Sequence, residues 1–424
     1  MAQQLNGKSA AAAAADHLAF VEDAISDLKE QLTDLKQSSN MTEAQYRQVN
    51  DSITELLKTL RGREDDILSM IDGNPYSHYN HVQSTPQTNV LVLASMRTGS
   101  SFIGEILNRN PKVLYAFEPI KQLMLKDGAP TLPFRGANQL RDFYACDFSS
   151  PDLKKYLDFY NSLAPPSRLD YVKAWVNKDN CKLKLSGYGW ESCKRISADG
   201  ATKSCRKYDI RAVKIIRIRD LSMFTHLMAD PEVNLRVLNV VRDPRGMMSS
   251  VMPLHLNNYQ VISKRVADRV LSVDHFNKNP GLRDRLKAYC DSMLRNYLLG
   301  QQPWFPRGRH MVIRYEDAAY DPRGMAAKIY SFLGVSMHGN VLRWLDVNTN
   351  IGDNERDLNY IYSTRRNSGQ TAESWRRKVT FDLAEAIQNT GSCREFMNTM
   401  GYRIVHSAAE LLNQSLSLVS PRQF

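Results

Sequence analysis

Residues 90–104, which read VLVLASMRTGSSFIG, constrain the fold more than any other part of the chain. The apolar run from Val90 to Ala94 is typical of a parallel strand that is covered on both faces. A loop of small polar residues follows, and a helix is expected to begin near Ser101. Small side chains around Gly99 let backbone N–H groups close on an anion, and the helix adds the positive end of its dipole. The stretch predicts a phosphate-binding loop in an α/β protein.

This loop lacks the pattern G-x-x-x-x-G-K-[ST], which argues against the β- and γ-phosphates of a nucleoside triphosphate as its ligand. Arg97 supplies a full positive charge to the same turn. The alternative for this stretch alone is an ordinary strand, turn and helix that binds nothing.

A second strand, turn and helix is expected at residues 235–250, which read LRVLNVVRDPRGMMSS. Arg242 stands at the end of the strand, Asp243 is a natural N-cap, and Pro244 is a natural first helical residue. The alternative is a capped helix with a solvated arginine. Two strand ends of this kind in one chain favour one ligand with two separated phosphates.

The two motifs resemble those of the sulfotransferases that use 3′-phosphoadenosine 5′-phosphosulfate (PAPS). That family has a loop for the 5′-phosphosulfate and a 3′-phosphate motif with Arg and Ser eight residues apart, as Arg242 and Ser250 are. The stretch SMRTGSSFIGEILNRNPKVLYAFEP is similar to the first motif of the Golgi galactose, N-acetylgalactosamine and N-acetylglucosamine 6-O-sulfotransferases. The most similar subgroup resembles keratan sulfate galactose 6-sulfotransferase and chondroitin 6-sulfotransferase. The matching segments that follow in order are DIRAVKIIRI, DPEVNLRVLNVVRDPRG, PRGRHMVIRYEDAAYDP, IYSFLGV and STRRNSGQTAESWRRKV.

The resemblance implies an α/β fold with a P-loop-like parallel sheet and helices on both faces, over a sulfotransferase domain at 89–406. Alternating apolar runs independently indicate parallel βαβ units, whose strands bind ligands at their C-terminal ends. The segment at about 127–208 has little periodicity and is expected to be an insertion that shapes the acceptor site. Residues 407–424 form a C-terminal tail. The expected strands lie near residues 90–94, 112–117, 211–216, 235–241 and 309–315.

Residues 1–72 differ from the rest of the chain, because apolar residues recur at heptad spacing from Leu18 to Leu60. This spacing predicts a coiled-coil stem that spaces the catalytic domain and forms a homodimer. The alternative is a single amphipathic helix folded onto the main domain. A linker is expected at 73–88.

The resemblance implies that Arg97 stabilises the leaving group; the alternative role is phosphate binding alone. The 5′-phosphate is expected to lie against a contiguous set of residues after the strand. These are Thr98, Gly99, Ser100, Ser101 and Phe102.

Glu118, in the run YAFEP, is the expected base for the acceptor hydroxyl, and its strand end is expected beside the phosphosulfate loop. The alternative is a solvated carboxylate at a strand end.

Arg242 and Ser250 are expected to bind the 3′-phosphate, with Ser249 as the neighbouring alternative. Arg366 resembles a late cosubstrate contact, although an exposed basic loop is equally compatible with its surroundings. Trp375 is expected in the core rather than stacked on adenine. Tyr315 and Glu316 are expected to serve packing and capping.

The net charge of +11 suits an acidic acceptor. No nucleic-acid-binding signature is present, so nucleic acid is not an expected partner. The six cysteines have no C-x-x-C spacing, which argues against zinc and for disulfides, with one local bridge among Cys181, Cys193 and Cys205. No metal is expected in the reaction.

The family is normally anchored by an N-terminal transmembrane helix, and no stretch here has the length of one. The resemblance nevertheless implies the Golgi lumen. Three sequons, at Asn40, Asn50 and Asn413, would carry glycans in the secretory pathway.

These features predict an enzyme that transfers the sulfuryl group of PAPS to the 6-hydroxyl of galactose or N-acetylhexosamine in keratan- or chondroitin-type glycans. One alternative is a P-loop NTPase, which would bind Mg-ATP and not PAPS. Another is a catalytically inactive glycan-binding scaffold.

Overall fold

The computed structural model describes residues 42, 47, 51, 87–121, 132–164, 173–176, 180–183, 190–230, 233–256, 271–350 and 367–421. The chain divides into two compact units, Met1–His81 and Val82–Phe424, and the second holds nearly all of the described residues. The predicted coiled-coil stem, and the dimer contact expected from it, lie outside the described residues apart from three single positions.

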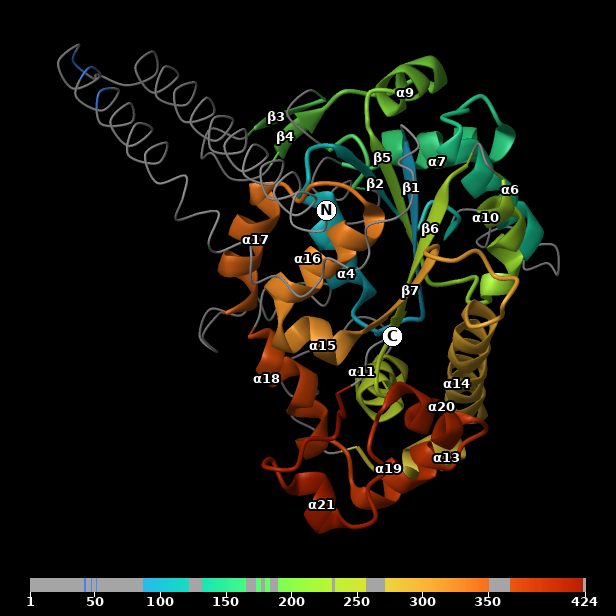
Figure 1. Cartoon of the computed structure of the whole chain (residues 1–424), viewed down its shortest axis with the longest axis vertical. Coiled ribbons are helices and arrows are strands. Elements are labelled where there is room, and N and C mark those ends of the chain that lie inside the picture. The colour runs from blue at the N-terminus through green and yellow to red at the C-terminus, as the bar shows by residue number, and fades with distance from the viewer. Residues whose placement is uncertain are drawn as a thin grey trace, which may run out of the picture. The chain divides into compact units, whose positions relative to one another are not determined.

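A parallel sheet of five strands forms the centre of this unit, in the order β2-β5-β1-β6-β7 (Figure 1). The expected parallel α/β architecture is confirmed. Each strand begins and ends within two residues of the run expected from the sequence. The strands are β1 (Thr88–Ala94), β2 (Val113–Phe117), β5 (Ile210–Ile215), β6 (Leu235–Val241) and β7 (His310–Arg314).

Strand β1 lies in the middle of the sheet, where Leu91 pairs with Val213 of β5 and with Val237 of β6. All seven of its residues are buried. This burial explains the unbroken apolar run, because a central parallel strand packs on both faces.

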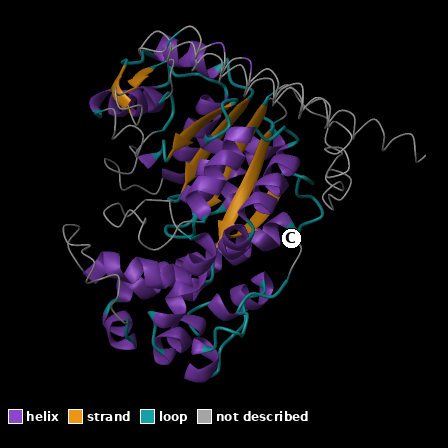
Figure 2. Ribbon diagram, turned by 90° about the vertical axis from the view of Figure 1, so that its left-hand side faces the viewer, coloured by secondary structure: helices purple, strands orange, loops and turns teal. Residues whose placement is uncertain are grey.

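Helices cover both faces of the sheet, as Figure 2 shows from the side. One face packs against α4 (Ser100–Asn108), α16 (Pro322–Leu333) and α17 (Gly339–Thr349). The other packs against α6 (Leu132–Tyr144), α7 (Pro151–Ser162), η2 (Leu221–Phe224) and α10 (Thr225–Ala229).

A third cluster of helices packs beyond the sheet, in the lower part of Figure 1. It comprises α11 (Pro244–Leu256), α13 (Val273–Lys278), α14 (Pro280–Gly300), η4 (Ser374–Arg377), α19 (Phe381–Gln388), α20 (Cys393–Met400) and α21 (Ala408–Leu412). Two short helices, α15 (Tyr315–Tyr320) and α18 (Ser368–Glu373), lie next to each other after β7.

The segment between β2 and β5, where the sequence shows little periodicity, contains α6, α7 and α9 (Ala198–Cys205). It also contains a small antiparallel hairpin of β3 (Cys181–Leu183) and β4 (Trp190–Cys193). Long-range packing around Trp175 holds part of this segment, since its ring lies 5.2 Å from that of Phe148.

All six cysteines are paired, so free thiols are ruled out for this structure. The expected local bridge is confirmed as Cys181–Cys193, across the β3–β4 hairpin. Two further bridges, Cys146–Cys205 and Cys290–Cys393, span 59 and 103 residues. Within the described residues, no helix is both long and apolar enough to cross a membrane.

Candidate active site

The carboxyl ends of the five parallel strands meet at one edge of the sheet and bring the expected site residues there. Strand β1 leads into the loop with Arg97, β2 into Glu118, β6 into Arg242 and β7 into Tyr315. Open parallel sheets bind ligands at this edge.

The loop after β1 turns sharply because two of its residues lie in the left-handed region. Arg97 has φ of 67° and Gly99 has φ of 84°. The hydroxyl of Thr98 is buried and donates to the carbonyl of Ser95 at 2.9 Å, which fixes the turn from inside. A Cβ at Gly99 would overlap the ring of Tyr315. Position 99 therefore requires glycine for its conformation and for the close approach of Tyr315.

Helix α4 begins at Ser100 with no side-chain cap on its first turn. The N–H groups of Ser100 and Ser101 therefore have no partner within the helix and face the loop, as in anion-binding helix starts.

Phe102 is the last of the residues expected along the 5′-phosphate, and its ring lies in the core. Its contact with the cosubstrate stays a prediction. Its N–H donates to the carbonyl of Gly99 at 2.9 Å, and its buried ring lies 5.9 Å from that of Trp344. The apolar ring belongs to the core on the α4 face, where burial stabilises it, rather than to the loop surface.

The side chain of Arg242 crosses from the end of β6 to the β1 loop. Its Nη1 donates to the carbonyl of Arg97 at 3.0 Å, and its guanidinium lies 4.6 Å from the ring centroid of Tyr315. Arg242 is only 7% exposed, and its buried Nε has no hydrogen-bond partner among the described residues. The structure thus joins the two motifs that the sequence places 145 residues apart.

Helix α11 starts as expected, because the carboxylate of Asp243 accepts the N–H of Arg245 at 2.9 Å. Ser250 is half-buried one and a half turns into this helix, and Ser249 is buried and donates to the carbonyl of Gly246 at 2.9 Å. Arg366 lies outside the described residues.

Glu118 is buried and ion-paired rather than solvated, so the alternative of a solvated carboxylate is wrong. Its carboxylate lies 3.0 Å from the Nζ of Lys214 and 3.3 Å from the Nε of Arg217. Its φ of 49° places the residue in the left-handed region. Burial lowers the pKa of Lys214, and the charge of Glu118 opposes that shift.

Strand β2, which ends just before Glu118, is not the immediate neighbour of β1, which leads into the phosphosulfate loop. That the end of β2 lies beside this loop stays a prediction. Strand β5 lies between β2 and β1. This order allows Lys214 of β5 and Arg217, just beyond it, to reach the Glu118 carboxylate. Periodicity identifies strands but does not give their order in the sheet, so the sequence analysis missed both cations.

A second buried carboxylate, Glu105 of α4, lies near this pair. It bonds to Lys173 and lies 2.7 Å from Arg109. The ammonium groups of Lys173 and Lys214 lie 5.7 Å and 4.0 Å from the ring centroid of Phe117. The described part of the insertion thus places Lys173 next to Glu105 and the ring of Phe117.

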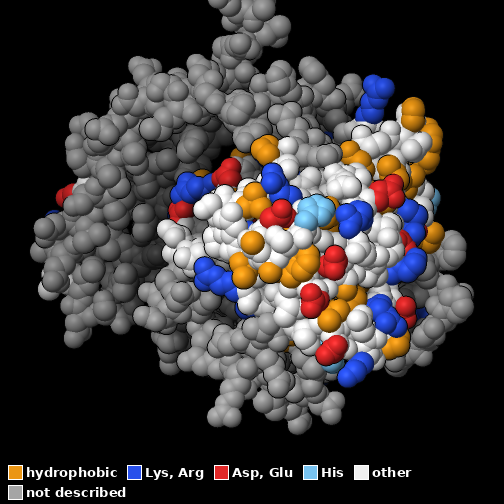
Figure 3. Space-filling view, turned by 90° about the horizontal axis from the view of Figure 1, so that it is seen from below, with side chains coloured by type: hydrophobic (Ala, Val, Ile, Leu, Met, Phe, Trp, Pro, Cys, Tyr) orange, Lys and Arg blue, Asp and Glu red, His pale blue; other side chains and the backbone are white. Residues whose placement is uncertain are grey.

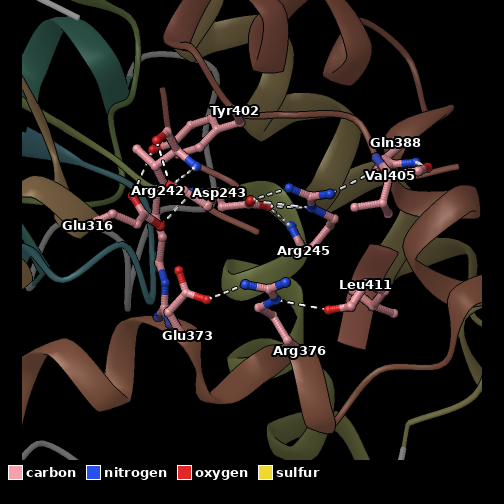
Figure 4. Close-up of polar contacts among 12 residues, drawn as sticks. Arg242, Asp243, Arg245, Glu316, Glu373, Arg376, Gln388, Tyr402, Val405 and Leu411 are labelled. Carbon is pink, nitrogen blue, oxygen red and sulfur yellow. Dashed lines mark hydrogen bonds and ion pairs between the residues drawn. The ribbon is translucent and has the colours of Figure 1, made fainter. Parts of the chain in front are cut away.

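Behind Arg242 lies a buried polar network, shown in Figure 4. The carboxylate of Asp243 accepts two bonds from Arg245, from Nε at 2.9 Å and from Nη2 at 2.6 Å. Glu316 accepts the N–H of Asp243 at 3.0 Å and the hydroxyl of Tyr402 at 2.9 Å. Burial, together with the charge of Asp243, raises the pKa of Glu316 to about 7.

Trp375 lies in the core, as expected, with 3% exposure and its ring centroid 4.8 Å from the guanidinium of Arg245. Tyr315 packs on the loop and Glu316 caps a backbone N–H, which matches their expected roles.

On the face of the molecule seen in Figure 3, basic and acidic side chains of the described residues are interspersed with apolar ones. Among the described residues, no cluster of three His, Cys, Asp or Glu side chains could hold a metal ion.

Residues 87–401 match the family model described as the sulfotransferase domain. Carbohydrate sulfotransferase 1 of Danio rerio is 30% identical over 84% of this chain and 86% of its own length. Carbohydrate sulfotransferase 3 of Homo sapiens is 32% identical over 80% of this chain and 72% of its own. Among solved structures, the sulfotransferase domain of the Synechococcus PCC 7002 olefin synthase aligns with 77% of this chain and 98% of its own, at 15% identity and a TM-score of 0.40.

Proposed function

Because the chain belongs to the carbohydrate sulfotransferases, enzymes that move a sulfuryl group from PAPS to a carbohydrate, we propose that it sulfates the 6-hydroxyl of galactose or N-acetylhexosamine. The acceptors proposed are keratan- or chondroitin-type glycans. One observation above all supports the assignment of the cosubstrate site. The side chain of Arg242 donates to the carbonyl of Arg97 at 3.0 Å, and this bond brings the two proposed anion-binding strand ends together in one site.

The residues of the β1 loop hold the 5′-phosphosulfate in this proposal. The N–H groups of Gly99, Ser100 and Ser101 and the start of α4 bind its oxygens. The guanidinium of Arg97 faces the bridging oxygen and stabilises the negative charge that develops on the departing phosphate. Arg97 is half-buried, so part of its side chain reaches the surface of the loop.

Arg242 and Ser250 hold the 3′-phosphate. The buried Nε of Arg242, which has no partner among the described residues, leaves a donor for an anion. A charge-assisted bond to phosphate would satisfy it, since a buried donor without a partner is costly. Arg366 is retained as a third cosubstrate contact, on the resemblance alone.

Glu118 acts as the general base. The acceptor oxygen attacks sulfur, the bond from sulfur to the phosphate oxygen breaks, and the hydroxyl proton passes to the Glu118 carboxylate. Lys214 and Arg217 hold this carboxylate at 3.0 Å and 3.3 Å, which fixes its position at the end of β2. The protein promotes such a transfer by positioning the two reactants and by supplying positive charge.

We assign the protein to an oxidising secretory compartment, the Golgi lumen. Three disulfides support this assignment, because such bridges are rare in reducing compartments. The dimer through the N-terminal stem is proposed from the heptad spacing, and the sequon at the exposed Asn413 is proposed to carry a glycan.

Transfer of labelled sulfate from PAPS to a panel of acceptors tests this function. The panel comprises chondroitin, desulfated keratan and N-acetylglucosamine-terminated glycans, with the sulfated position read from the product disaccharides. A 6-sulfated product on one acceptor is the expected result. Transfer to another position contradicts the 6-O assignment, and glycan binding with no transfer to any acceptor supports the inactive scaffold.

A further inference from the structure

The backbone of Arg242 is held from both sides by one hydroxyl. The Oη of Tyr289, in α14, accepts the N–H of Arg242 at 2.8 Å and donates to its carbonyl at 2.6 Å. The next N–H, that of Asp243, donates to Glu316 at 3.0 Å. These bonds fix the peptide from which the guanidinium extends, and all four residues are at most 7% exposed.

Glu316 is also bonded to the C-terminal segment 400–420. The hydroxyl of Tyr402 donates to its Oε2 at 2.9 Å, and Tyr402 forms a β-bridge with Val419. Arg314, two residues before Glu316, donates to the carbonyls of Met400 and Ser420 at 2.9 Å and 2.8 Å.

The two tyrosines belong to one packed unit. The ring of Phe396, in α20, lies 5.5 Å from the ring of Tyr289 and 6.1 Å from that of Tyr402. Further hydrogen bonds join the start of α11 to the C-terminal segment 400–420. Arg245 donates to the side chain of Gln388 at 2.9 Å, and Gln388 donates to the carbonyl of Val405 at 3.0 Å.

We propose that Glu316 and Tyr402 are positioning residues for the 3′-phosphate arginine, Arg242, so that the C-terminal segment 400–420 forms part of the cosubstrate site. This inference rests on the proposed function, in which Arg242 binds the 3′-phosphate. Tyr402 holds the carboxyl of Glu316, Glu316 holds the N–H of Asp243, and that N–H fixes the direction in which Arg242 leaves strand β6.

The burial of the Glu316 carboxyl group costs free energy, and a positioning role gives that cost a function. A carboxyl group that is 2% exposed, beside the carboxylate of Asp243, is unfavourable unless it is well bonded. The backbone N–H at the end of β6 could be satisfied by a neutral acceptor. Glu316 instead bonds to two partners, one beside the site and one in the C-terminal segment.

Binding of two nucleotides that differ only in the 3′-phosphate tests the inference. The two nucleotides are 3′-phosphoadenosine 5′-phosphate (PAP) and adenosine 5′-phosphate (AMP), and both are measured on the full chain. The affinity for PAP is measured by calorimetric titration, and that for AMP by its competition with PAP. We expect Glu316→Ala to weaken PAP about tenfold, the effect of one lost charge-assisted bond at the arginine, and to leave AMP within about twofold. Tyr402→Phe should weaken PAP severalfold with the same selectivity.

Glu316→Gln is the conservative variant expected to retain binding. Its amide oxygen still accepts the N–H of Asp243, and its amide N–H can donate to the hydroxyl oxygen of Tyr402. It should keep the PAP affinity within about twofold. Glu373→Ala is the matched control. Glu373 is bonded to Arg376, which holds the same C-terminal segment, but it does not contact Asp243. This variant should leave the ratio of PAP to AMP affinity unchanged.

Arg242→Ala separates failure of the inference from failure of the proposed site. If this variant weakens PAP selectively while Glu316→Ala and Tyr402→Phe do not, the positioning role is overturned and the 3′-phosphate assignment stands. If it weakens PAP and AMP equally, the assignment of Arg242 itself fails. Should Glu316→Ala not fold, Tyr402→Phe and Glu316→Gln decide the question, and an equal loss of both nucleotides in Tyr402→Phe overturns the inference.

Discussion

Glu118 combines a left-handed backbone conformation with a buried ion pair, which is more restraint than a structural carboxylate at a strand end needs. We expect Glu118→Gln to lower kcat about 100-fold or more, because a general base contributes about that factor, while the affinity for PAP stays unchanged. Single-turnover transfer and nucleotide titration measure the two quantities.

Glu105→Gln is the matched control, since Glu105 is also a buried carboxylate bonded to a lysine and an arginine. It should lower stability and leave kcat within severalfold. Equal losses of kcat in the two variants would assign Glu118 a structural role only.

The raised pKa of Glu316 makes stability depend on pH. The folded-state pKa of Glu316 is about 7, above the ordinary value of 4.5. Between these two pH values the folded protein holds a proton on Glu316 that the unfolded chain releases. The stability that comes from this proton is fully present below about pH 4.5 and is lost as the pH rises through about 7, with a limit of about 3 kcal/mol.

Urea unfolding between pH 5 and pH 8 measures this slope. Wild type should lose stability relative to Glu316→Gln as the pH rises, because glutamine cannot ionise. Parallel stability curves for the two proteins would mean that Glu316 titrates at its ordinary pKa.

Sequence reasoning could identify Arg97, Glu118 and Arg242 because each follows an apolar strand, where parallel sheets bring side chains to one edge. It could not identify Lys214, Tyr289 or Tyr402. Lys214 lies inside a strand, Tyr289 lies in α14, and Tyr402 lies just after α20, and nothing in the local sequence marks either tyrosine as more than a packing residue. Their roles depend on strand order and on contacts 47 to 96 residues apart along the chain.

At the scale of elements, the loop from β1 to α4 depends on one glycine. Gly99→Ala would strain a φ of 84°, which costs about 1–2 kcal/mol, and would place a methyl group against the ring of Tyr315. We expect a loss of stability of at least that size, together with weaker binding of both PAP and AMP, because Tyr315 also packs on Arg242. Urea unfolding and nucleotide titration measure these losses.

Gly281→Ala in α14 serves as the control for the added methyl group. A Cβ there meets only the Asn279 side chain, at 3.4 Å. This variant should be neutral in stability and binding. A Gly99→Ala protein with normal stability would contradict the requirement for glycine in the loop.

Strands were the elements best predicted from sequence, because a buried parallel strand is an unbroken apolar run, and β6 coincides with the expected 235–241. The helices of the segment 127–208 were not predicted. Their apolar residues pack around Trp175 and against the sheet through contacts distant in sequence, and α9 contains mostly small polar residues. Tertiary packing and the Cys146–Cys205 bridge, rather than local propensity, hold them in place.

At the scale of the whole molecule, the Cys290–Cys393 bridge joins α14, whose Tyr289 bonds to the backbone of Arg242, to α20. Cys290 follows Tyr289 in α14, and Cys393 begins α20, which leads to Tyr402. Both sulfurs lie in the buried cluster of the lower helices. We expect the double variant Cys290→Ala with Cys393→Ala to lose about 2–5 kcal/mol of unfolding free energy, because the bridge closes a loop of 103 residues.

The bridge between Cys181 and Cys193 is the control, since it closes only 12 residues in a hairpin remote in sequence from Arg242. Its double alanine variant should lose less stability and keep its PAP affinity. Removal of Cys290–Cys393 should weaken the binding of PAP more than that of AMP. Without the bridge, α14 and α20 pack less firmly, which loosens the bonds of Tyr289 to Arg242 and of Tyr402 to Glu316. Equal effects of the two double variants on PAP would show that the long bridge stabilises the fold without supporting the site.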